Sequence, residues 1–126
     1  DLHLSLGCRF MFEPLGQGIL DQIAATVHAR GLRFGFGGIA RLDEGLLPGR
    51  DVLAEHLRLG SQAVILSRTF HSGDYSSLET QVDGLREAEH QLVQRVPPTI
   101  ELDKQRVAGK ISKISQTMQE RTKEFH

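Results

Sequence analysis

Two apolar runs, separated by about 30 residues, constrain the fold of this chain more than any other feature. The first covers residues 32–39 and the second covers residues 63–70, and each ends among small or basic side chains. Near-continuous apolar runs of this length are typical of parallel strands that are buried on both faces. A repeat of about 30 residues is the size of one βα unit, so the runs predict neighbouring parallel strands joined by a helix.

The same alternation of strand and helix extends over most of the chain. Strands are expected over residues 2–6, with residues 10–12 as the alternative, over residues 32–37 and over residues 62–67. Apolar residues at helical spacing predict helices over residues 19–30, 51–59 and 76–95. Gly31 and Gly60 are placed to end the first two helices, and Asp51 is placed to cap the second. This order predicts an α/β fold with a parallel sheet and right-handed crossovers.

The last third of the chain has a different character. Ser76 and Glu79 have the spacing of a capping box, which predicts the start of a long helix. Pro97 and Pro98 break that helix, and a last helix follows with an apolar stripe at Val107, Ile111, Ile114, Met118 and Phe125. Such a narrow stripe fits packing on a neighbour or in a short coiled coil. We therefore divide the chain into a partial βα segment, residues 1–96, and a helical extension, residues 97–126.

Composition argues against several classes of partner. The net charge is −1, so no positive field exists to hold nucleic acid or an anionic membrane. No apolar run approaches the roughly 20 residues of a membrane span. A single cysteine precludes an internal disulfide and fits a reducing, cytoplasmic setting. The six histidines have no metal-ligand spacing, so no metal site is expected, and the sequence indicates no particular cofactor.

The glycine-rich end of the first run has two interpretations. Gly37 and Gly38 lack a Cβ, so the backbone there can approach a ligand closely, or they form only a tight turn after a strand. The pattern is not a nucleotide P-loop, because no lysine follows at the required spacing. It is not a dinucleotide loop either, because residues 41–48 intervene before the next helix.

The second run ends at Ser67 and Arg68, where an arginine after a buried strand needs a partner. That partner is either a bound anion or a carboxylate of the chain, Glu44 or Glu13. Because the carboxyl ends of parallel strands converge, the first interpretation predicts one anion pocket made by residues 37–38 and 67–68.

Three charged residues that follow expected strands are candidates for catalysis: Glu13, Arg41 and Glu44. A carboxylate at the end of a strand can serve as a general base. A solvated loop position is the alternative for Glu13.

Together these segments resemble the last part of the phosphate-binding (β/α)8 barrels. The seventh strand of that group commonly ends in Gly-Gly-Ile, as residues 37–39 do, and the eighth ends in a small residue and a short apolar stretch, as residues 67–70 do. The resemblance covers residues 1–95 as strands six to eight. It implies that the backbone at Gly37, Gly38, Ser67 and Arg68 contacts a phosphate. The loop after Ile39 is longer than is usual in that group, and the segment from Pro97 has no counterpart in a minimal barrel.

The resulting expectation is part of a barrel enzyme, of lyase, aldolase or isomerase type, that binds a small phosphorylated metabolite. The alternative is a non-catalytic interaction or scaffold protein that assembles through its C-terminal helices. The chain starts at Asp1, without an initiator methionine, and enters a strand-like pattern at once. We therefore expect a piece of a longer protein, whose missing strands come from more chain or from another copy in a homo-oligomer.

Overall fold

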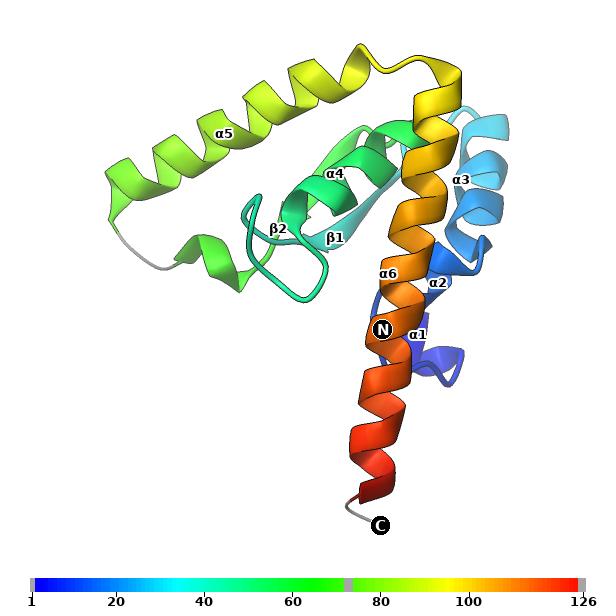
Figure 1. Ribbon diagram of the computed structural model, residues 1–126. Helices are drawn as coiled ribbons and strands as arrows, with labels where there is room; N and C mark the ends of the chain where they lie inside the picture. The colour runs from blue at the N-terminus through cyan, green and yellow to red at the C-terminus, as the bar shows by residue number, and fades with distance from the viewer. Residues whose placement is uncertain (1, 72–73, 125–126) are drawn as a thin grey trace.

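The computed structural model describes residues 2–71 and 74–124, with side chains described as far as residue 121. Its elements follow one another as α1 (Leu2–Ser5), α2 (Glu13–Gly16), α3 (Ile19–Ala29), β1 (Gly35–Ile39), α4 (Gly49–Arg58), β2 (Ala63–Leu66), the 3-10 helix η1 (Arg68–His71), α5 (Tyr75–Val93) and α6 (Pro97–Glu124) (Figure 1). Phe125, the last residue of the expected apolar stripe, lies outside the described residues.

The second and third predicted strands, expected over residues 32–37 and 62–67, are confirmed. Strands β1 and β2 pair in parallel, with Gly35 opposite Ala63 and a register shift between Gly37 and Ile39. Helix α4 connects them, as the spacing of the two apolar runs predicted. The described residues therefore have the mixed α/β character that was expected, with a sheet of two strands.

The prediction of a strand near the N-terminus is wrong. Residues 2–5 form α1, where the amide of Leu6 donates to the carbonyl of Leu2, and residues 10–12 form bends and turns. A strand needs a neighbour for its backbone hydrogen bonds, whereas a helical turn satisfies them locally. In residues 10–12 the aromatic side chains belong to the core instead. Phe10 and Phe12 are buried and pack edge to face, with 5.6 Å between ring centroids.

The expected helices are present, but two of them begin differently. The cap of α5 is Asp74, whose carboxylate accepts a hydrogen bond from the Ser77 amide at 2.8 Å, so Ser76 and Glu79 do not form the predicted capping box. Asp51 is not a cap either: α4 already begins at Gly49. Pro97 stands at the start of α6, where a missing N–H costs no helical hydrogen bond.

Helix α6 crosses the molecule and packs on α2 and α4 (Figure 1). Val107 and Ile111 of its stripe are buried and belong to the same hydrophobic core as Ile39 and Val52. The N-terminal part of the predicted stripe, Val107 and Ile111, is therefore covered by other elements of the same chain.

The two faces of the sheet are covered differently. Phe36 of β1 stacks on the ring of His56 of α4, so its side chain faces that helix. Because side chains alternate along a strand, the opposite face carries Gly35 and Gly37, with Ala63 and Ile65 beside them in register. Ile65 is 69% exposed, so this second face is open among the described residues.

Candidate functional site

The carboxyl ends of β1 and β2 lie side by side. The amide of Ser67 donates to the carbonyl of Ile39 at 2.8 Å, which continues the pairing past the end of β2. Gly37, Gly38, Ser67 and Arg68 therefore lie at the same end of two adjacent strands, where the sequence placed them.

Gly38 has a role that the sequence did not indicate. Its φ of +91° falls at the register shift of β1, and a Cβ there would collide with the Cε atom of Met11. At Gly37 a Cβ would lie 3.3 Å from the Cβ of Ile65. The described group that approaches Gly38 closely is thus a side chain of the same chain, and backbone conformation and internal packing already account for this glycine.

Arg68 lies at this same end of the sheet. It begins η1 and is exposed, and among the described residues its guanidinium has no hydrogen bond or ion pair. The expected alternative, an ion pair with Glu13 or Glu44, is therefore not formed. An exposed guanidinium without a partner keeps all its N–H donors available to an anion.

The neighbouring hydroxyl groups link the two loops that follow the strands. Ser67 Oγ and Thr69 Oγ1 lie 3.1 Å apart, and the backbone amide of Arg41 donates to Thr69 Oγ1 at 3.1 Å. The segment after β1 is thereby held against the segment after β2. Arg41 is one of the predicted catalytic residues. Its backbone amide thus contacts Thr69, the residue that follows Arg68 in the chain.

Arg41 and Glu44 form an ion pair within the loop after β1. The nitrogen–oxygen distance is 4.0 Å, and the side chains are 14% and 50% exposed. A pair this long with one exposed partner contributes little to stability. Its value to a site would lie in placing a cation and a carboxylate together near the strand ends.

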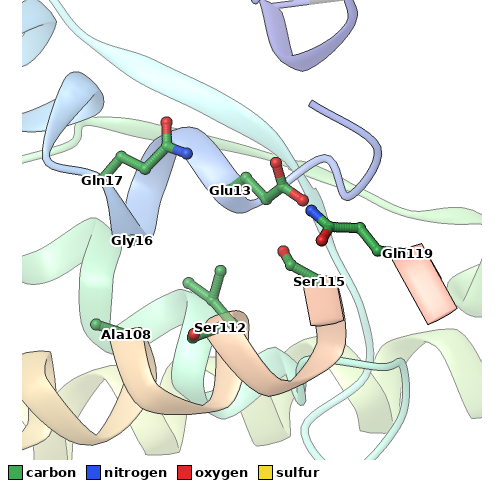
Figure 2. Close-up of a pocket in the computed structure, with 8 residues that line it drawn as sticks. Glu13, Gly16, Gln17, Ala108, Ser112, Ser115 and Gln119 are labelled. Carbon is green, nitrogen blue, oxygen red and sulfur yellow. The ribbon is translucent and has the colours of Figure 1, made fainter. Parts of the chain in front are cut away.

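Glu13 lies elsewhere, in a small cavity of about 280 Å³ between α2 and α6 (Figure 2). The Ser115 hydroxyl of α6 is the main cause that lowers the pKa of the Glu13 carboxyl. Burial opposes this effect, and the Cys8 thiol and the Phe10 amide assist it. The Ser115 oxygen is buried beside the carboxylate without completing a well-formed hydrogen bond to a described group.

The three predicted catalytic residues do not form one cluster. Among the described residues, no hydrogen bond or ion pair joins Glu13 to Arg41 or Glu44. A lowered pKa also makes Glu13 a weak base, because a general base works best with a pKa near the working pH.

His56 is the residue that the sequence interpretation missed. It is 2% exposed, its ring stacks on Phe36 at 3.6 Å between centroids, and Nδ1 lies 2.8 Å from Ser61 Oγ. Burial lowers its pKa to about 4, so the ring is neutral at physiological pH. The signal was present: with Leu53 and Leu57, His56 occupies the inward face of an amphipathic helix.

Comparison of the chain with protein-family models, with curated proteins and with solved structures gives no match. Within residues 2–71 and 74–124, no helix has the length and apolar character needed to cross a bilayer. In that same part of the chain, no three histidine, cysteine or acidic side chains converge as metal ligands.

Proposed function

We propose that this chain is part of a (β/α)8-barrel enzyme that binds the phosphate of a small metabolite at the carboxyl ends of β1 and β2. The observation that carries the proposal is Arg68, an exposed guanidinium without a described partner beside the end of β1. Ligands of parallel α/β proteins bind at the carboxyl ends of the strands. The guanidinium fork matches the oxygens of a phosphate.

The open face of the sheet supports the barrel part of the proposal. Parallel sheets in α/β proteins have both faces covered, and α4 covers only one face here. The other face carries Gly35, Gly37, Ala63 and the exposed Ile65. In a barrel, the face opposite the helices is the packed interior. The further strands would come from a longer chain or from a second copy in a homo-oligomer.

The reaction classes that fit are those of lyases, aldolases and isomerases, which combine a phosphate grip with acid–base groups. Arg41 and Glu44 are the charged groups that we assign to the reacting end, because the Arg41 amide binds Thr69, the residue after Arg68. Glu13 faces α6, and we assign it no step. No cofactor is assigned, and the single cysteine favours a cytoplasmic setting.

An interaction protein that assembles through its C-terminal helices is the second candidate. Three apolar residues near the junction of α5 and α6 favour it, because they are largely exposed: Val93, Val96 and Leu102. The covered residues Val107 and Ile111 cannot serve that purpose without leaving the core.

Calorimetric titration with inorganic phosphate and with ribose 5-phosphate separates the two candidates. The proposal expects saturable binding that Arg68→Ala weakens about tenfold or more, which is the effect of losing one charge-assisted hydrogen-bonded contact. Arg33→Ala is the matched control, since Arg33 is also exposed but precedes β1. Absence of binding, or equal affinity in the wild type and Arg68→Ala, contradicts the phosphate site. Self-association that Leu102→Lys abolishes would instead support assembly through the helices.

A further inference from the structure

A second cavity, of about 370 Å³, lies between α4, β2 and α5. Each of the three elements contributes a pair of large aliphatic side chains to its walls: Leu53 and Leu57 of α4, Val64 and Leu66 of β2, and Val82 and Leu85 of α5. Cavities of this size with apolar walls and few polar groups are typical of small-molecule sites.

The aliphatic residues of β2 that line this cavity remain accessible. Val64 is in register with Phe36, whose ring stacks on His56 of α4, so Val64 lies on the same face of the sheet as that helix. Leu66 follows on this face, because side chains alternate along a strand. The two residues are still 38% and 36% exposed, whereas Ile39, the register partner of Leu66, is fully buried. The face of the sheet that α4 covers therefore ends in an apolar hollow at β2.

Helix α5 is held against α4 and does not close this hollow. Arg50 of α4 donates to Gln91 Oε1 at 3.2 Å, and Arg95, just after α5, donates to the carbonyl of Ala54 at 3.1 Å. Leu92, between these two positions of α5, is buried in the core. Moving α5 onto β2 would break these contacts, so the cavity is a preformed feature of the fold.

The charges among the described residues of the lining are balanced. Arg86 and Glu89 of α5 form an ion pair at 3.2 Å. Burial lowers the pKa of His56 to about 4, so its ring is neutral at physiological pH. A charged ligand would lose its hydration against aliphatic walls without gaining a counter-ion. The walls therefore favour an uncharged, apolar molecule.

We propose that this cavity binds a small, uncharged, apolar molecule of about ten carbon atoms. A dry cavity of about 150 Å³ with aliphatic and aromatic walls holds benzene, so a cavity of about 370 Å³ has room for two fused rings. The ligand covers the exposed surface of Val64 and Leu66, and removing this surface from water drives binding. The site is separate from the proposed phosphate site and does not depend on it.

Methyl NMR on the full chain tests the proposal with two probes, naphthalene and its carboxylated analogue 2-naphthoate. Naphthalene should give saturable shifts of the methyl groups of Val64, Leu66, Val82 and Leu85. Ile65 is the internal control: its side chain projects from the opposite face of β2, so its methyl groups should not shift. Naphthoate should bind about tenfold more weakly or worse, because its charge finds no counter-ion in the cavity.

Two variants locate the binding. Val82→Trp should block naphthalene by filling the cavity. Val93→Trp is the matched control on α5 and should bind as the wild type does, because Val93 is exposed and lies outside the cavity.

Absence of saturable shifts, equal shifts at Ile65, equal affinity for both probes, or unchanged binding in Val82→Trp overturns the proposal. Shifts of the cavity methyl groups on concentrating the protein alone also overturn it, because a second copy would then occupy the cavity. The wild-type methyl shifts decide the matter even if Val82→Trp does not fold.

Discussion

Helix α4 and strand β2 reverse the usual relation between polarity and burial. Helix α4 buries three polar residues, Asp51, Glu55 and His56, which are 5%, 4% and 2% exposed. Strand β2 consists of four apolar residues and is exposed along its whole length. Charged side chains are almost never fully buried unless they are paired, so the comparison turns on what surrounds each element.

Within residues 2–71 and 74–121, other elements supply partners to the helix and none to the open side of the strand. Asp51 pairs with Arg106 at 3.0 Å and with Lys110 at 2.6 Å, both from α6. Glu55 pairs with Arg58, which also holds Asp21 of α3. In these two elements, burial therefore follows the availability of a covering layer or a counter-charge rather than the hydrophobicity of the residue.

The largest expected effect comes from Arg58→Met. The Arg58 side chain is 12% exposed; burial alone would lower its pKa, but the hydrogen bonds that it donates to Asp21 and Glu55 raise it. Removing the cation leaves the Glu55 carboxylate buried and unpaired, which should cost about 3 to 5 kcal/mol of unfolding free energy. Urea denaturation measures this loss.

The matched control adds Glu55→Leu to Arg58→Met. Replacing both members of a buried pair by apolar residues is often close to neutral, so the double variant should regain most of the lost stability. A double variant as unstable as Arg58→Met alone would show that the ion pair is not what protects α4.

Acid titration tests the buried histidine of the same helix. The folded pKa of His56 lies at about 4, below the ordinary 6.5, so the unfolded chain takes up the proton first as pH falls. The stability that the neutral His56 contributes to the unfolding free energy is constant above pH 6.5. About 3 kcal/mol of this free energy is lost between pH 6.5 and pH 4.

His56→Phe should flatten this part of the stability profile, and His90→Gln, at an exposed site on α5, should leave it unchanged. A wild-type profile that is already flat between pH 6.5 and pH 4 would contradict the buried, neutral state of His56.

Gly38→Ala tests the contact between the end of β1 and the Met11 side chain. The positive φ and the contact with Met11 should together cost about 1 to 3 kcal/mol. Adding Met11→Ala should recover only the part due to the collision. Thermal denaturation of the three proteins separates the two contributions, and an unaffected Gly38→Ala variant would refute the backbone conformation described for this residue.

Ile65→Thr is expected to have the smallest effect. With Ile65 69% exposed on the open face, the loss should stay within about 0.5 kcal/mol. Val52→Ala provides the contrast, because Val52 is fully buried and its truncation should cost clearly more. A loss above about 1 kcal/mol for Ile65→Thr would mean that another copy of the chain covers this face in solution.

The elements that sequence could predict are those with local signals. The two apolar runs correctly predicted β1 and β2. Gly31 and Gly60, both at positive φ, follow the ends of α3 and α4 as predicted. These signals are local, because run length, period and a terminating glycine depend on only a few neighbouring residues. The prediction of an N-terminal strand was wrong because the backbone hydrogen bonds of a strand depend on a neighbouring strand elsewhere in the chain.

The candidate site divides in the same way. Adjacency of the ends of β1 and β2 follows from parallel pairing and was predictable. The contact of Glu13 with Ser115 joins distant positions, and no local pattern announces it. The clash between a Cβ at Gly38 and Met11 could not be predicted from the sequence either, because only the fold brings these two residues together.

Amide NMR during a titration with inorganic phosphate tests the proposed phosphate site most directly. The account predicts saturable shifts centred on the amides of Gly38, Arg68 and Thr69, and their loss in Arg68→Ala but not in Arg33→Ala. Shifts that are absent from this end of the sheet, or that persist unchanged in Arg68→Ala, would contradict it.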